Sequence, residues 1–436
     1  MSEHALSPLD QAHAHRLDGH EEAALRLAIA CARSTPDAPG PVALIARVLV
    51  EGEQPFEVSK VSTRLVDAYV RRGDLPSAVV ASTIALDAGG KQRPLLKRIA
   101  EAFAKDAKKA GGGSLHPPPF PVDPAMPSDL GKLSGEQLLA EAKRTLDAYV
   151  ALQDSVADEK KPDLPLFGTL NSKELEQLLS AVRVEEVSSG HEIVRQDDPG
   201  NEAFVVARGS LHVVRRQGAD ETVLAQLGPG AIFGEMALIS ESPRSASVVA
   251  LEPAQLLVLA RDELERAAEE APALGQQLSA FCHGRMHANL VRTARVLSGL
   301  PEADRVALLP QLESVVFEPG QRIIHRDEEA STAYLLASGA VSISVPEDGE
   351  RLVLATLGPG EVIGEMSLIL RRPASADVTA LYTTVAYALS QEKLTALMRT
   401  YPALLVELYD LATRRDDEIR ATPLDETTLT ADDILV

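Results

Sequence analysis

The chain has 436 residues, 45% of them hydrophobic and 25% charged, which is typical of a globular protein with about two to four domains. Its net charge of −21 disfavours nucleic-acid binding, because an acidic surface repels a phosphate backbone and no run of five Lys or Arg residues forms a basic patch. No stretch of 18 apolar residues predicts a membrane span, and no amino-terminal pattern predicts a secretory signal. The two distant cysteines, Cys31 and Cys282, predict no metal or redox site, and we expect a cytoplasmic protein.

Residues 1–110 carry only helical patterns. Two segments, RLDGHEEAALRLAIACARSTP and VDAYVRRGDLPSAVVASTIALDAGG, share a glycine and an alanine five residues apart, Gly19 with Ala24 and Gly73 with Ala78. This phrase resembles tetratricopeptide helical hairpins, in which small residues let paired helices approach closely. A plain helical bundle remains the alternative.

Residues 111–133 are predicted to be a linker. GGGSLHPPPFPVDPAMPS, residues 111–128, contains three Gly and six Pro, which suit neither a helix nor a central strand. We expect it to let the first helices move relative to the rest of the chain. A connecting helix follows at 134–160, and Ser134 with Gln137 predicts a capping box at its start.

From residue 161 onward, short strand patterns alternate with Gly-bearing turns, which predicts a jelly roll or barrel. This region repeats itself without a gap at a spacing of 130 residues. LGPGAIFGEMAL and LGPGEVIGEMSL agree at eight of twelve positions. Two copies of one domain are therefore predicted, at 161–297 and 298–420, each followed by helices, with an acidic tail at 421–436.

The predicted fold class is α+β multidomain: amino-terminal α-helical hairpins, then two β jelly-roll barrels, each with flanking helices.

The segment FGEMALISESPRSASV, residues 233–248, places complementary groups close together. Gly234 allows close approach to the start of a short helix, where free backbone N–H groups form an anion site. Arg244, aimed by the turn at Pro243, presents a guanidinium to two phosphate oxygens, and Ser245 adds a hydroxyl. Glu235 requires a neutral donor, such as a ribose hydroxyl. The set predicts a site for a phosphate joined to a sugar.

The same segment resembles the phosphate-binding cassette of the cyclic-nucleotide-binding domain, found in catabolite activator proteins, protein-kinase-A regulatory subunits and cyclic-nucleotide-gated channels. The agreement covers Gly234, Glu235, Ala237, Leu238, Pro243, Arg244 and Ala246. The resemblance implies that the ligand is cAMP or cGMP, and Ser245 does not decide between them. It further implies that Glu235 holds the ribose 2′-hydroxyl, that Arg244 holds the cyclic phosphate, and that the backbone of Met236, Ala237 and Ala246 completes the site.

The second copy departs from this pattern. Ala374 stands at the position of Arg244, whereas Gly364, Glu365, Ser375 and Ala376 remain. A phosphate bound there lacks its paired cation, so we expect a degenerate site. Arg372 is close enough in sequence to replace the cation, but Pro373 stiffens the loop between them.

Other patterns indicate no chemistry. Four histidines near the amino terminus have no Cys or carboxylate spacing that completes a metal site. No nucleophile elbow, P-loop or paired catalytic carboxylates are present, so we expect no catalytic residues, no cofactor and no enzyme.

We therefore expect a cyclic-nucleotide receptor and signalling regulator, whose first domain couples ligand binding to a protein partner held by the amino-terminal helices. By resemblance, ligand capture pulls in the helix at about 262–298, which also connects the two domains. A homodimer is compatible with this expectation. The alternatives are a scaffold that binds no nucleotide and an inhibitor similar to a protein-kinase regulatory subunit, although the linker has no basic pseudosubstrate. A transcription factor requires a DNA-reading helix, which the acidic carboxyl end does not offer.

Overall fold

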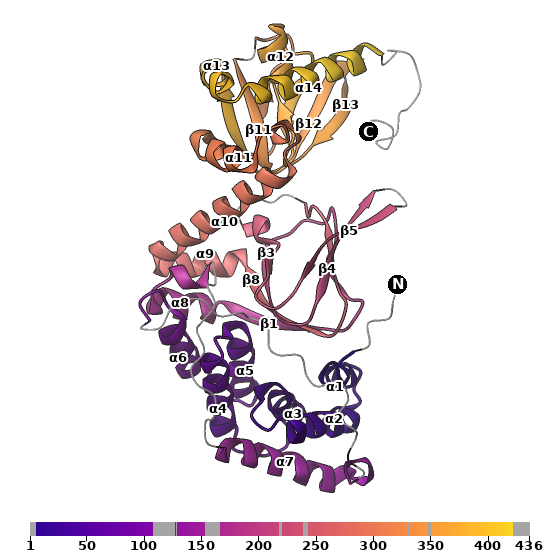
Figure 1. Ribbon diagram of the computed structural model, residues 1–436, viewed down its shortest axis with the longest axis vertical. Helices are drawn as coiled ribbons and strands as arrows, with labels where there is room; N and C mark the ends of the chain where they lie inside the picture. Colours follow the sequence, from indigo (N-terminus) through magenta and orange to yellow (C-terminus); the bar gives the residue numbers. More distant parts are fainter. Residues whose placement is uncertain are drawn as a thin grey trace. The chain divides into compact units, whose positions relative to one another are not determined.

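The computed structural model describes residues 6–107, 127, 129–152, 166–217, 220–238, 243–329, 331–347 and 350–421 (Figure 1). The predicted linker up to residue 126, the end of the connecting helix at 153–160 and the tail from 422 lie outside the described residues. The chain divides into two compact units. One comprises Met1–Asp197, Glu202–Gly234 and Ser245–Leu278, and the other comprises Asp198–Asn201, Glu235–Arg244 and Ser279–Val436.

The amino-terminal region is helical, as predicted. Its helices are α1 (Pro8–Leu17), α2 (Glu21–Ser34), α3 (Pro39–Glu51), α4 (Val58–Arg71), α5 (Leu75–Asp87), α6 (Arg93–Phe103) and α7 (Gly135–Ala151).

The two repeated phrases lie at helix–helix turns. Gly19 joins α1 to α2 and Gly73 joins α4 to α5, with φ of 77° and 71°, a conformation that favours glycine. Ala24 and Ala78 are fully buried where the paired helices pack. The paired packing fits helical hairpins, and the tetratricopeptide resemblance stays a prediction.

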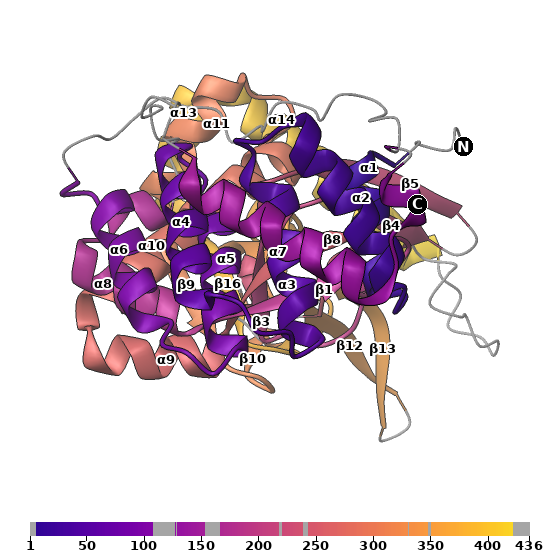
Figure 2. The same ribbon diagram turned by 90° about the horizontal axis from the view of Figure 1, so that it is seen from below.

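Helix α7 packs across α2, α3 and α4 rather than continuing the row after α6 (Figure 2). It buries the side chains of Leu138, Ala142, Leu146 and Tyr149. The predicted capping box at its start is wrong, because Ser134 makes no side-chain cap hydrogen bond. The Gly135 N–H instead donates to the Glu22 carboxylate at 2.8 Å, so a tertiary contact replaces the local cap.

The first barrel consists of two antiparallel four-stranded sheets, in the orders β1-β8-β3-β6 and β2-β7-β4-β5. Helix α8 (Ser172–Ser180) precedes the barrel and starts at a capping box made by Asn171 and Glu174. The strands are β1 (Val182–Val187), β2 (Glu192–Val194), β3 (Glu202–Arg208), β4 (Leu211–Gln217), β5 (Asp220–Leu227), β6 (Ile232–Phe233), β7 (Ser247–Ala250) and β8 (Ala254–Ala260).

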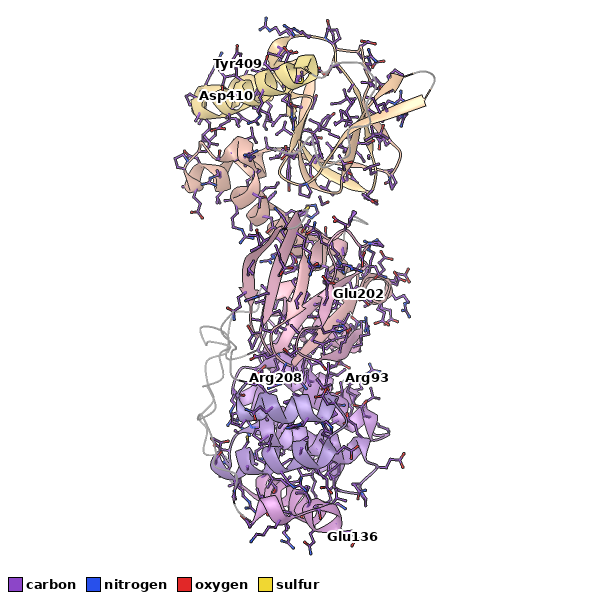
Figure 3. All side chains as sticks on the ribbon, turned by 90° about the vertical axis from the view of Figure 1, so that its right-hand side faces the viewer. Arg93, Glu136, Glu202, Arg208, Tyr409 and Asp410 are labelled. Atoms are coloured by element: carbon purple, nitrogen blue, oxygen red, sulfur yellow. The ribbon has the colours of Figure 1, made fainter. Side chains whose placement is uncertain are left out.

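The amino-terminal helices pack directly on the first barrel within one compact unit. Arg208, at the end of β3, pairs with Asp10 of α1 where the helices meet the barrel (Figure 3). Arg16 pairs with Glu186 of β1, and the Ser77 hydroxyl of α5 donates to the Ala207 carbonyl at 3.5 Å. These ion pairs and the packing of α5 against β3 and β8 place the described helices on the first barrel, and the predicted movement of the helical region stays a prediction.

The helices after the first barrel are α9 (Arg261–Glu270) and α10 (Pro272–Thr293), followed by α11 (Glu302–Leu308). The second barrel again has two antiparallel sheets, β14-β11-β16-β9 and β10-β15-β12-β13. Its strands are β9 (Glu313–Phe317), β10 (Arg322–Ile324), β11 (Thr332–Ser338), β12 (Val341–Glu347), β13 (Glu350–Leu357), β14 (Val362–Ile363), β15 (Asp377–Ala380) and β16 (Thr384–Ser390). The closing helices are α12 (Glu365–Leu370), α13 (Gln391–Thr400) and α14 (Pro402–Ala421).

The two barrels repeat each other in detail. The β4–β5 ladder shifts register between Val213 and Val214, and the β12–β13 ladder shifts between Ile343 and Ser344. These positions differ by the same 130 residues as the sequence repeat. The predicted jelly-roll-like pair with flanking helices is confirmed.

Candidate functional site

Both cassettes begin at a glycine in the left-handed region. Gly234 has φ of 73° and precedes a short 3-10 helix, η3 (Glu235–Leu238). Gly364 has φ of 77° and caps α12. A Cβ on Gly364 would lie 2.9 Å from the Thr332 carbonyl oxygen, so only glycine fits there. The predicted helix start after the glycine is present in both copies.

Glu235, predicted to hold a sugar hydroxyl, is only 4% exposed. Its carboxylate accepts a hydrogen bond from Nε of Arg285, on α10, at 3.0 Å. The Cys282 thiol, also on α10, lies 3.7 Å from the Glu235 carbonyl oxygen, and burial raises its pKa to about 12. This thiol is therefore a packing group rather than a nucleophile.

Glu365 has the equivalent partner in the second copy, but more deeply buried. Arg415, on α14, donates to the Glu365 carboxylate at 2.6 Å, to the Val362 carbonyl at 2.6 Å and to Glu361 at 3.1 Å. The Arg415 side chain is 19% exposed, whereas that of Arg285 is 42% exposed. Burial still raises the pKa of the Glu365 carboxyl above its usual value, although Arg415 opposes this shift.

Our reading of the sequence missed both helix arginines. Each lies 50 residues after its cassette glutamate, Arg285 after Glu235 and Arg415 after Glu365. Extending the repeat into the following helices would have shown that these two arginines match. Their contact with the glutamates depends on how each helix packs, which the spacing does not reveal.

Arg244, predicted to hold the phosphate, is partly buried, and its backbone N–H donates to the Asp198 carbonyl at 2.9 Å. Its guanidinium lies over the backbone of Gly200. Among the neighbouring predicted residues, Ala237 and Ala246 are buried and Ser245 is exposed. Met236 is partly buried against the apolar cluster that includes Met286 of α10 and Tyr387 of β16.

In the second copy, Ala374 is buried in the hydrophobic core of its barrel, so the position of the missing arginine is apolar. Ser375 is exposed and Ala376 is buried, as at the matching positions of the first copy. The Arg372 guanidinium pairs with Asp416 of α14 at 3.1 Å. In this structure the Arg372 side chain therefore lies against α14 rather than at Ala374.

The first cassette therefore has the start of a short 3-10 helix, a guanidinium and a buried carboxylate within ten residues of chain. These groups suit a ligand with one negative charge and a hydroxyl donor. Within the described residues, no three His, Cys, Asp or Glu side chains gather into a possible metal site. No described helix combines the length and apolarity that a membrane crossing requires.

Residues 184–271 and 314–401 each match the family described as the cyclic nucleotide-binding domain. The chain thus contains two such domains in tandem.

It is homologous to a regulatory subunit of a cAMP-dependent protein kinase and to part of a cGMP-dependent protein kinase. It is 31% identical over 217 residues to the cAMP-dependent protein kinase regulatory subunit of Yarrowia lipolytica, covering 49% of this chain and 54% of that protein. It is 28% identical over 256 residues to cGMP-dependent protein kinase 2 of Mus musculus, covering 58% and 32%. The chain thus spans about half or less of the length of these curated relatives.

Among solved structures, the chain is similar to the regulatory domain of Toxoplasma gondii PKA with cAMP. The identity is 23%, the match covers 58% of this chain and 92% of that one, and the TM-score is 0.27.

Proposed function

We propose that the protein is a regulatory receptor for a cyclic purine nucleotide, cAMP or cGMP, and has no catalytic activity of its own. The observation that carries this proposal is the first cassette, where buried Glu235 begins a short helix and Arg244 follows nine residues later. The two matched domains and the kinase regulatory subunit among the relatives support the same function.

In this proposal, Arg244 pairs with the cyclic phosphate and Glu235 accepts from the ribose hydroxyl. Gly234 leaves room for the ligand, and the backbone of Met236, Ala237 and Ala246 surrounds the phosphate, with Ser245 at the exposed edge. Because Arg285 already donates to Glu235, an incoming hydroxyl shares or displaces that hydrogen bond. Ligand binding then changes the contact between Glu235 and Arg285 that joins the cassette to α10. This change favours one of two ways in which α10 packs.

The second domain does not bind nucleotide in this proposal. Ala374 supplies no cation, and Arg415 already engages both Glu365 and Glu361 in a more buried setting. A ligand there would have to separate a buried pair without gaining a phosphate partner, which costs several kcal/mol at order of magnitude.

The output in this proposal is a protein contact made by the amino-terminal helices. Since α1 and α5 pack on the first barrel, that barrel masks part of the helical surface, and a partner gains access when the contact loosens. A kinase partner is the specific alternative that the relatives favour. The linker at 111–133 lacks the basic sequence that a pseudosubstrate requires.

Isothermal titration of the full chain with cAMP and with cGMP tests ligand binding. We expect one site per chain, and Arg244→Ala should lose about 2–5 kcal/mol of binding free energy, because it removes the charge-assisted partner of the phosphate. The matched control is Arg372→Ala in the second copy, which should bind like wild type. Equally small heats for wild type and Arg244→Ala with both nucleotides would leave the scaffold as the better function. Two sites per chain, reduced to one by Glu365→Ala, would refute the inactive second domain.

A further inference from the structure

The guanidinium of Arg244 occupies space that a side chain at Gly200 would need. A Cβ on Gly200 would lie 2.2 Å from Nε of Arg244, 2.4 Å from Cζ and 2.7 Å from Nη2. Ordinary van der Waals contacts of a Cβ begin at 3.4 Å. The position of the guanidinium is therefore compatible only with a residue at 200 that has no side chain.

The backbone at Gly200 does not by itself require glycine. Its φ is outside the left-handed region, unlike that of Gly234 at 73°. An alanine at position 200 would therefore not have to adopt a left-handed conformation. Glycine at position 200 therefore matters for the space that the Arg244 guanidinium occupies, and not for a left-handed backbone conformation.

The second copy provides an internal comparison. Arg244 corresponds to Ala374 by the repeat, and Gly200 corresponds to Ala330. The backbone contact of the loop is the same in both copies, since the Ala374 N–H donates to the Glu328 carbonyl at 2.9 Å as Arg244 does to Asp198. The glycine is thus absent from the copy that lacks the arginine.

We propose that Gly200 is a positioning residue for Arg244, and that it sets the orientation in which the guanidinium meets the ligand phosphate. This inference rests on the proposed function, because it concerns the same site. An alanine at 200 must push the guanidinium away by about an ångström or more, to reach ordinary contact distance. Two-point pairing of a guanidinium with phosphate oxygens depends on orientation, so such a displacement weakens it.

A double-mutant cycle on the full chain tests the proposal: wild type, Gly200→Ala, Arg244→Ala and both changes together, each titrated with cAMP and cGMP. We expect Gly200→Ala to weaken binding by about 10- to 100-fold when Arg244 is present. In the Arg244→Ala background, Gly200→Ala should change the dissociation constant by less than about twofold. Gly131→Ala is the matched control and should bind like wild type, because Gly131 is exposed and an added Cβ there would meet nothing within 4 Å.

Thermal unfolding of the same four proteins without ligand separates this inference from the proposed function. Gly200→Ala should lower the unfolding midpoint only slightly when Arg244 is present, because the displaced group is the flexible end of a side chain, and should not lower it in the Arg244→Ala background. If no protein binds either nucleotide, the proposed function fails and the unfolding cycle alone decides the role of Gly200. Wild-type affinity in Gly200→Ala, or equal effects of Gly200→Ala with and without Arg244 in either assay, overturns the inference.

Discussion

The buried pair of Glu365 and Arg415 gives a prediction whose size follows from the structure. Glu365 is 2% exposed, and the Arg415→Ala change removes the guanidinium that lies 2.6 Å from its carboxylate. Breaking a buried pair leaves a charge without compensation and costs about 3–5 kcal/mol. We therefore expect Arg415→Ala to lower the free energy of unfolding by about 3 kcal/mol at pH 8.

The cost of this change should depend on pH in a defined direction. Burial already raises the pKa of Glu365 above its usual value, and loss of Arg415 raises it further. Between the unfolded and folded pKa values of Glu365, the folded variant therefore keeps a proton on this carboxyl that the unfolded chain has lost. The free energy of unfolding of the variant thus falls as the pH rises through the folded pKa. The deficit is largest at pH 8 and should shrink as the pH is lowered toward about 5.5, since a tenfold change in proton affinity corresponds to about 1.4 kcal/mol.

Urea unfolding followed by circular dichroism at pH 8 and pH 5.5 measures the effect. The matched variant is Arg285→Ala, which removes the equivalent arginine of the first copy, whose side chain is 42% exposed. Because water reaches the Arg285 guanidinium more easily, its pair with buried Glu235 is weaker, and we expect Arg285→Ala to cost less than Arg415→Ala. The prediction is wrong if the two variants lose the same free energy of unfolding at pH 8, or if the loss in Arg415→Ala grows as the pH is lowered. Either result would show that burial of the Glu365–Arg415 pair does not control its contribution to stability.

Two further predictions concern the amino-terminal helices. Burial, with two nearby arginines, lowers the pKa of His13 to about 3, so only the unfolded chain binds a proton below about pH 6.5. Stability that His13 contributes above that pH is lost in acid, by about 2 kcal/mol at pH 5. Between pH 7.5 and 5, the free energy of unfolding in urea should therefore depend less on pH in His13→Leu than in wild type. His20→Ala, a change at an exposed histidine, should behave like wild type. The same pH dependence in all three proteins would contradict this reasoning. Asp10→Ala removes the carboxylate that pairs with the partly buried Arg208 guanidinium and should cost about 1–3 kcal/mol, with faster trypsin cleavage where the helices meet the first barrel. Unchanged cleavage would show that this ion pair does not hold the helices in place.

Local patterns were sufficient to predict the elements of this fold. The shared spacing of Gly19 with Ala24 and Gly73 with Ala78 pointed to paired helices, and the structure places both glycines in left-handed turns between helices, a conformation that favours glycine. The cap of α7 could not be predicted, because the Gly135 N–H bonds to a carboxylate 113 residues earlier in the chain. Ser134 and Gln137 match the sequence pattern of a capping box, but the structure has the tertiary contact with Glu22 in place of that local cap.

The sequence by itself determined the tandem domains and the chemical groups of the first cassette. A repeat of 130 residues without a gap leaves one economical interpretation, and the groups of the cassette that we propose bind the ligand lie within one short segment. Only the tertiary structure decided what surrounds those groups. Arg285 reaches Glu235 from a helix 50 residues later, and Gly200 makes room for Arg244 from 44 residues earlier. The physical reason is that packing across the fold decides which side chains meet. Local patterns with the period of a helix or a strand do not reveal contacts between residues this far apart in the sequence.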